Sequence, residues 1–239
     1  MKNIKFLSII LFIPLLAAFY QGDGLSENVT GLKPAPNDPV ALVKKIVMDV
    51  KYKKTSNQDD WDLAKTGTPL DDGGEVRTGE KSLALVLFLD GSLLRVRANS
   101  ILHIYGKKKE KAMDKNTFIQ KGLVGFDVKK QSADEEFKFT TPTVVASIRG
   151  TSGYLQYSED STFTMYLASG SAGLYAQSDC DSIAAGNTVV IRSNGQCISR
   201  VATQQDENVN DETNKSVIKK IKIRTNKGEV NIEYYGPGN

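Results

Sequence analysis

The stretches Leu87–Ile104, LFLDGSLLRVRANSILHI, and Phe139–Thr151, FTTPTVVASIRGT, decide the fold. In each stretch, short runs rich in Val, Ile and Leu are separated by residues that favour turns. Asp-Gly-Ser and Asn-Ser interrupt the first stretch, and Arg-Gly-Thr follows the last apolar run of the second. This spacing is typical of β-strands joined by tight turns. Both stretches therefore predict a succession of short strands.

The same pattern continues along the chain. Apolar and polar residues alternate in Ile46–Tyr52, Leu94–Ala98, Val124–Val128 and Phe163–Leu167. A period of two indicates strands with one buried and one solvated face. Leu83–Leu89, LALVLFL, is apolar throughout but too short to cross a membrane, so we expect a strand that is buried on both faces. Strands this short predict an all-β domain of the roll, solenoid or sandwich type.

The composition divides the chain into five segments. We expect a signal peptide (residues 1–20), a flexible lead-in (21–39), the β domain (40–201), a polar linker (202–216) and a C-terminal β-hairpin (217–239). The linker prediction rests on a near absence of apolar residues. The hairpin prediction rests on alternation on both sides of Asn226-Lys227-Gly228, where glycine allows the positive φ of a turn. Within the β domain, only Pro39–Lys45 favours a short helix.

The amino terminus indicates export. Two lysines in Met1–Lys5 precede the apolar run Phe6–Tyr20, FLSIILFIPLLAAFY, which ends in small and aromatic residues. A basic start followed by a short apolar core is typical of a secretory signal peptide. No later run is apolar and long enough to span a bilayer, so we expect no membrane span after cleavage.

The two cysteines, Cys180 and Cys197, are expected to form a disulfide. Export places them in an oxidising compartment, where such pairs usually bridge. The alternative is a metal or redox pair. We disfavour it because the spacing is not C-x-x-C and the single histidine, His103, is distant in sequence.

The order of these motifs resembles the FecR domain, a β-rich module of bacterial extracytoplasmic proteins. The resemblance begins at Lys65–Gly79, passes through Gly122–Lys129 (GLVGFDVK), and ends at Ala184–Val190. Its most specific element is TPTVVASIRGT at Thr141–Thr151. One departure is Gly153, where the family usually has a bulky apolar residue. The motif residues that we expect to act mainly in the structure are Asp90, Gly91, Ser92, Asn99, Ser100, Arg149, Gly150 and Thr151.

Functional roles for the motif residues compete with structural ones. Arg149 can contact an anion or partner, but we expect its guanidinium to tie neighbouring turns together. Asp90 can act as an acid, but we expect it to cap its own turn. His103 lacks nearby Cys or His residues and is a poor metal ligand, so we expect it to face solvent from a strand.

The resemblance implies a role outside the cytoplasm. Founding members of the family are membrane regulators that control a sigma factor, and this chain resembles only their outer module. We expect no catalytic residues, no cofactor and no metal, because no nucleophile stands in a recognisable setting with a base. A net charge of +3, from 31 basic and 28 acidic residues, gives no reason to expect nucleic-acid binding.

The sequence therefore predicts a non-catalytic, periplasmic or secreted domain that mediates protein–protein interaction or ligand sensing at the bacterial envelope. The alternative is a carbohydrate-binding or wall-associated structural module. The expected partner is accordingly an envelope protein or a glycan. An exposed strip of tyrosines would favour a glycan, whereas an exposed sheet edge would favour a protein. The candidate tyrosines are Tyr154, Tyr157, Tyr166 and Tyr175.

The export prediction is testable on the mature protein. Signal peptides are cleaved after about 15–30 residues. Mass spectrometry of the envelope fraction should therefore find an amino terminus between Ala18 and Leu25. Intact Met1 in a cytoplasmic fraction would contradict both the compartment and the reasoning for the disulfide.

Overall fold

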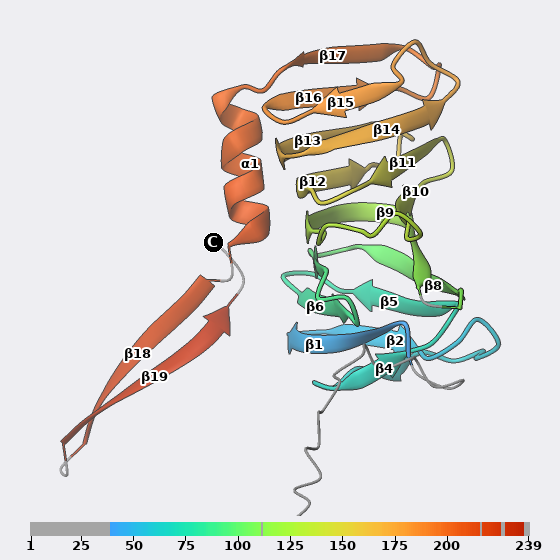
Figure 1. Cartoon of the computed structure of the whole chain (residues 1–239). Helices are drawn as coiled ribbons and strands as arrows, with labels where there is room; N and C mark the ends of the chain where they lie inside the picture. Colours follow the sequence, from blue (N-terminus) through green and yellow to red (C-terminus); the bar gives the residue numbers. More distant parts are fainter. Residues whose placement is uncertain (1–38, 111, 216, 226–227, 237–239) are drawn as a thin grey trace, which may run out of the picture. The chain divides into compact units, whose positions relative to one another are not determined.

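The computed structural model describes residues 39–110, 112–215, 217–225 and 228–236. The predicted signal peptide and nearly all of the predicted lead-in lie outside these residues. The described body consists of two β-sheets whose strands follow one another as rungs, from β1 and β4 at one end to β17 at the other (Figure 1). The all-β prediction is confirmed.

The first sheet contains nine strands, all of them antiparallel to their neighbours. Their spatial order is β4 (Thr68–Leu70), β1 (Ala41–Val47), β6 (Leu83–Phe88), β7 (Leu93–Val96), β9 (Met113–Asp127), β12 (Ser152–Tyr157), β13 (Phe163–Ser169), β16 (Asn187–Ile191) and β17 (Cys197–Val201).

The second sheet also contains nine strands, and it shares β9 with the first. Their order is β3 (Asp62–Leu63), β2 (Val50–Lys53), β5 (Gly74–Thr78), β8 (Ile101–Lys108), β9, β10 (Phe137–Thr140), β11 (Val144–Ile148), β14 (Ser171–Ala176) and β15 (Ser182–Ala184). Of the described strand pairs, β9–β10 alone is parallel.

Strand β9 crosses from one sheet to the other at Gly122. Residues 113–121 pair with β8 in the second sheet, whereas residues 122–127 pair with β12 in the first. Gly122 has φ 118°, and a Cβ at this position would collide with the Ser100 side chain. Glycine is required here because other residues disfavour this backbone conformation and have no space for a side chain.

The core lies between the inner faces of the two sheets. Its centre is a group of contacting rings from both sheets. Phe88 lies 5.0 Å from Phe137, and Phe126 lies 4.9 Å from Phe139, measured between ring centroids. Strand β6 is buried almost throughout, as its continuous apolar run predicts. Aromatic pairs at these distances stabilise the core beyond their area of burial.

The structure corrects two predictions of secondary structure. Pro39–Lys45 does not form a helix, because Ala41 and Val43 are buried in β1, between β4 and β6. The predicted linker contains helix α1 (Gln204–Asn214). Its sequence shows no apolar stripe because the helix docks through polar contacts instead. Among the described residues, no helix is long and apolar enough to cross a lipid bilayer.

The C-terminal hairpin is confirmed. Strand β18 (Val217–Thr225) pairs with β19 (Gly228–Gly236) in a two-stranded sheet of their own. Ile223 is directly opposite Val230. Both of these side chains are substantially exposed, at 41% and 49%.

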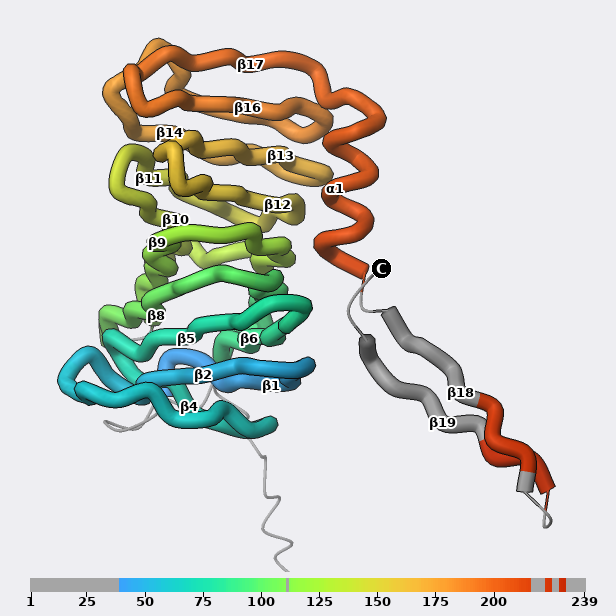
Figure 2. Tube along the Cα trace, turned by 180° about the vertical axis from the view of Figure 1, so that it is seen from behind, coloured from blue at the N-terminus to red at the C-terminus, as the bar shows by residue number. Residues whose placement is uncertain are grey.

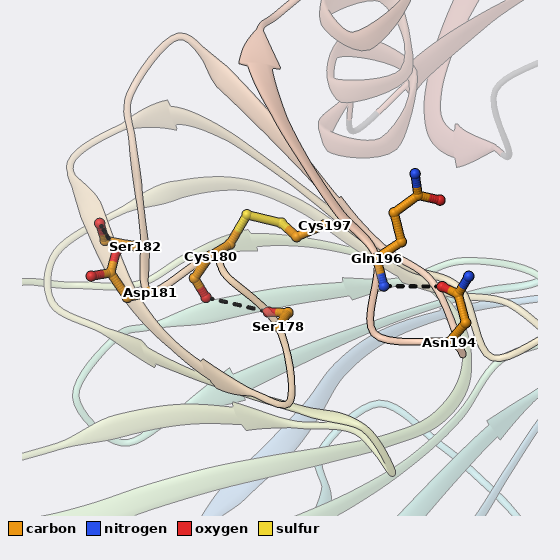
Figure 3. Close-up of a disulfide and its surroundings, with 7 residues drawn as sticks. All are labelled: Ser178, Cys180, Asp181, Ser182, Asn194, Gln196 and Cys197. Carbon is orange, nitrogen blue, oxygen red and sulfur yellow. Dashed lines mark hydrogen bonds between the residues drawn. A yellow bond between two sulfur atoms is a disulfide. The ribbon is translucent and has the colours of Figure 1, made fainter.

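The predicted disulfide between Cys180 and Cys197 is confirmed (Figure 3). Cys180 lies between β14 and β15 of the second sheet, whereas Cys197 is the first residue of β17 in the first sheet. Their Cα atoms are 6.0 Å apart, within the usual range for a disulfide. The bond therefore joins the two sheets at the end of the body that β17 forms.

Loss of this bond should destabilise the body. Replacing Cys180 and Cys197 together by serine should lower the free energy of unfolding by about 2–4 kcal/mol, because the unfolded chain regains freedom. Denaturant titration measures this change. Ser182→Ala, in the adjacent β15, is the matched control and should change stability little. Two reactive thiols in oxidised, unfolded protein would contradict the disulfide.

Candidate functional site

The Asp90-Gly91-Ser92 turn contacts strand β9 and stabilises the core strands. The two carboxylate oxygens of Asp90 accept hydrogen bonds from the Ser92 backbone (2.9 Å), the Ser92 hydroxyl (3.0 Å) and Gln131 (3.0 Å). The buried ammonium of Lys115, on β9, lies 3.0 Å from the same carboxylate. Gly91 supports the turn with φ 83°. Asp90 therefore caps its own turn and also fixes that turn to β9.

The electrostatics of Asp90 suit this structural role. Burial raises the pKa of this carboxyl, but hydrogen bonds from Gln131 and Ser92 and the pairing with Lys115 outweigh it. The pKa of Asp90 consequently lies below its ordinary value. A general acid needs a proton near neutral pH, so this arrangement favours the ionised, structural carboxylate.

The Asn99-Ser100 turn supports the crossing of β9. Asn99 adopts the left-handed conformation (φ 57°), which asparagine tolerates better than most residues. The Ser100 hydroxyl accepts a hydrogen bond from Leu123 N–H (3.2 Å), immediately after Gly122. The turn therefore contacts β9 where that strand changes sheet.

The Ile148–Thr151 segment also has local structural contacts. Ile148 is buried, and Arg149 donates to the Ser132 carbonyl (3.1 Å). Gly150 has φ 71°, and Thr151 accepts a hydrogen bond from Val128 N–H (2.9 Å). Arg149 thus connects two loops, although its side chain remains accessible to solvent.

His103 is less solvated than the sequence predicts. Its ring is half-buried on β8, with Nδ1 3.6 Å from Glu75 and the ring centroid 5.4 Å from that of Phe118. Within the described residues, no group of three or more His, Cys, Asp or Glu side chains is arranged to hold a metal ion.

The beginning of helix α1 is held against the first sheet by one buried carboxylate. Asp206 accepts hydrogen bonds from the backbone and the hydroxyl of Thr203, both at 2.7 Å. Arg200, on β17, makes two contacts with the same carboxylate, at 2.5 and 3.1 Å. The hydroxyl of Tyr154 lies 3.5 Å away. Thr203 is the N-cap of the helix, and Asp206 is both the third helical residue of its capping box and the link of the helix to the sheet.

The contacts around Asp206 shift the pKa values of Asp206 and Tyr154. The Arg200 hydrogen bonds hold the pKa of Asp206 well below its ordinary range, although burial opposes this effect. Burial and the nearby Asp206 charge raise the pKa of Tyr154 to about 12. At neutral pH the cluster therefore contains a carboxylate, a guanidinium and a neutral phenol.

The exposed tyrosine strip that would favour a glycan does not form. Tyr154, Tyr157 and Tyr166 are buried, and only Tyr175 is exposed, at 67%. The first two lie on β12 and the third on β13, where the core or α1 covers them. The sequence alternation does not reveal this cover, because the helix that supplies it has no apolar stripe.

Strand β17 presents an open edge. Of the described strands, only β16 pairs with it. Hydrogen bonds at the two ends of the pair run from Arg192 N–H to Gln196 O (3.0 Å) and from Ala202 N–H to Gly186 O (2.9 Å). Alternation along an antiparallel strand then directs the backbone N–H and C=O of Ser199 away from β16. Within the described part of the chain, neither group has a partner.

The side chains of β17 indicate that the sheet can continue. Val201 is opposite Asn187, on the same side as the buried Val189 and Ile191. It thus lies on the inner side of the first sheet, yet it is 76% exposed. An apolar side chain on the inner side at an uncovered edge is a feature of strands that pair with another chain.

A broad polar groove lies on the second sheet and beside it. It has a volume of about 1230 Å³. Tyr105, on β8, is the exposed aromatic residue in its wall, at 38%. Charged groups in the groove are largely paired with each other, such as Lys138 with Glu136 (2.7 Å) and Lys54 with Asp71 (3.6 Å). The groove thus favours a polar ligand over an apolar one.

Comparison with protein families identifies the family of the central part of the chain. The model of the FecR protein family matches residues 74–173. This part of the chain is a FecR domain. Comparison with curated proteins gives no match. The FecR segment runs from β5 into β14. It contains the Asp90-Gly91-Ser92 turn, the Asn99-Ser100 turn and the crossing of β9.

Two solved structures are similar to the chain. Both are of a "putative anti-sigma factor" from Parabacteroides distasonis, at 1.65 and 2.50 Å resolution. Each is 14% identical, covers 56% of this chain and 62% of that chain, and gives a TM-score of 0.48. The match thus spans less than two thirds of that protein's own length.

The FecR domain fits a non-catalytic regulatory role that is associated with the cell envelope. The β17 edge, the disulfide and α1 all lie beyond residue 173, outside the matched segment. The motif residues inside that segment make contacts that hold turns to neighbouring strands and loops. The accessible edge at β17 therefore lies outside the matched FecR segment.

The Asp206 cluster predicts a specific pH dependence. A carboxyl whose pKa is lower in the folded state stabilises the protein above its unfolded pKa, and this contribution is lost as pH falls below about 4. Asp206→Ala should lower the stability of docked α1 by about 2 kcal/mol at neutral pH, through loss of the cap and the ion pair. Hydrogen exchange of the α1 amides measures this loss.

The control is Asp211→Asn, on an exposed position of the same helix. It should retain both the neutral-pH protection of α1 and its loss in acid. Asp206→Asn should flatten the acid dependence. An unchanged acid dependence in Asp206→Asn would show that another carboxylate holds the helix.

Proposed function

We propose that this chain is a non-catalytic, extracytoplasmic FecR protein that binds another protein by strand addition at β17. The observation that carries the proposal is the unpaired backbone of Ser199 at the end of the first sheet, beside the exposed inner side chain of Val201. In strand addition, backbone hydrogen bonds supply affinity and alternate side chains supply specificity.

The β17 edge is held in place at both ends. The Cys197 disulfide fixes its first residue to the second sheet. Arg200 and Asp206 fix its last residues to α1, and the Arg200 guanidinium also donates to the Val201 carbonyl (3.3 Å). An edge that is already ordered loses little conformational entropy when a strand pairs with it.

The compartment supports the same proposal. A disulfide is stable in an oxidising compartment, and the FecR domain fits association with the envelope. We therefore place this function in the periplasm or outside the cell. A protein partner there can pair with β17 without passing a membrane.

One observation favours a second candidate, the sensing of a polar ligand. The groove beside Tyr105 combines an exposed ring with amide and charged groups, which suits a glycan. The side-chain oxygen of Asn116, in the wall of this groove, accepts a hydrogen bond from the Thr140 hydroxyl (2.8 Å). Retention on immobilised glycans that is lost in Tyr105→Ala would support this candidate.

Proline at the edge tests the main proposal. Ser199→Pro removes an N–H that points away from β16, a position where edge strands tolerate proline. Capture of envelope proteins by the immobilised mature chain should fall by about tenfold or more, because edge hydrogen bonds are lost and the ring blocks the approach of a strand. Quantitative mass spectrometry of the captured proteins measures the change.

The matched control is Ser199→Ala, which removes the hydroxyl but retains the backbone N–H. It should capture the same proteins as the unaltered chain. Circular dichroism and thermal unfolding check that both variants fold. Equal capture by a folded Ser199→Pro variant would exclude β17 as the binding edge.

A further inference from the structure

We propose that the strand that pairs with β17 is β19 of a second copy of this chain. This inference rests on the proposed function of the β17 edge and names its partner. The chain contains both halves of such an interface. Among the described strands, the first sheet ends in a strand with one unpaired edge, and the hairpin belongs to no larger sheet.

The hairpin needs a partner for its own stability. A two-stranded hairpin is at best marginally stable in water, and a third strand or a packed face is required. The exposed Ile223 and Val230 are opposite each other across β18 and β19. Addition to a sheet would bury this apolar pair and would satisfy one open edge of the hairpin.

The hairpin cannot reach β17 of its own chain. A Cβ on Gly125 of β9 would lie 2.5 Å from the Asn214 side chain, so the end of α1 is directly over β9. Four strand spacings separate β9 from β17, or about 19 Å at ~4.8 Å each. A hairpin that pairs with β17 must run alongside it, so β18 would have to begin at least this far from β9. Strand β18 begins three residues after Asn214, and three extended residues span at most about 11 Å.

The contacts of α1 with the first sheet fix the distance between Asn214 and β17. The Asn214 amide donates to the Gly153 carbonyl of β12 (3.0 Å), and Arg95 of β7 donates to the Asn214 carbonyl oxygen (3.3 Å). Arg97 reaches the Lys215 carbonyl (3.4 Å). The start of the hairpin is thus tied to the middle of the first sheet, and a second copy must provide the acceptor edge.

Charge favours β19 over β18 as the pairing strand. Strand β18 contains four basic residues (Lys219, Lys220, Lys222 and Arg224) and no acidic residue, whereas β19 contains two acidic residues (Glu229 and Glu233) and no basic residue. Arg192 lies beside the start of the acceptor edge, whereas Arg200 is already paired with Asp206. Opposite charges on adjacent strands stabilise pairing and like charges oppose it.

Each copy then donates one hairpin and accepts another. Reciprocal donation closes a twofold dimer, and one-way donation gives a longer assembly. In both cases the Val201 side chain gains a neighbouring strand on the inner side of the sheet. The inference therefore predicts association of the purified chain that depends on both elements.

Complementation between two variants tests this inference. Ser199→Pro blocks the acceptor edge and leaves the hairpin intact. The double variant Ile223→Lys and Val230→Lys alters the donor hairpin and leaves the edge intact. Light scattering of the mature chain should show concentration-dependent association, and each variant alone should associate about tenfold or more weakly. An equimolar mixture should regain association, because one intact hairpin meets one intact edge.

The matched controls are Ser199→Ala for the edge and Lys222→Ala for the hairpin, and both should associate as the unaltered chain does. Photo-crosslinking from p-benzoyl-phenylalanine at position 199 locates the contact. In a mixture of isotopically heavy and light chains, the crosslinks should join position 199 of one chain to residues 228–236 of the other.

Several outcomes would overturn the inference. These are a monomer at all concentrations, association that Ser199→Pro does not weaken, no recovery in the mixture, or crosslinks within one chain only. If the chain is monomeric while Ser199→Pro still abolishes capture of a different envelope protein, the inference fails and the proposed function stands. If Ser199→Pro changes neither self-association nor capture, both fail.

Discussion

The structure depends on one strand that belongs to two sheets. Strand β9 can cross between them because Gly122 has a positive φ and leaves space for Ser100. Of the described strands, only β9 forms backbone pairs in both sheets. A side chain at this crossing would force the backbone or the Ser100 turn to move, so the two faces of the core could not keep their register.

The two motif turns secure this crossing. Asp90 holds the buried Lys115 in the first half of β9, and Ser100 contacts Leu123 just after the crossing. Buried polar groups are stabilising only when their partners are in place, so these turns and β9 depend on each other. The most recognisable residues of the FecR segment therefore maintain its architecture, and the open edge at β17 lies outside that segment.

Helix α1 packs on the first sheet and connects it to the C-terminal hairpin. Glycine at Gly125 lets the helix approach the sheet closely, whereas a Cβ on Gly153 would collide with the Tyr166 carbonyl of β13. The departure from the family at Gly153 thus has a structural reason. Asp206 holds the beginning of the helix and Asn214 holds its end. The same contacts cover Tyr154 and determine where the hairpin can reach.

The sequence by itself determined the strands, the turns at Asp90 and Asn99, the hairpin and the disulfide, because alternation, turn chemistry and cysteine pairing are properties of short segments and of the compartment. Only the tertiary structure decided that residues 204–214 form a helix, that β9 belongs to both sheets and that the outer edge of β17 has no partner among the described strands. These features depend on contacts between distant residues, such as Arg200 and Tyr154 with Asp206. A polar helix without an apolar stripe leaves no periodic signal, and the position of an open edge depends on how all the strands pair.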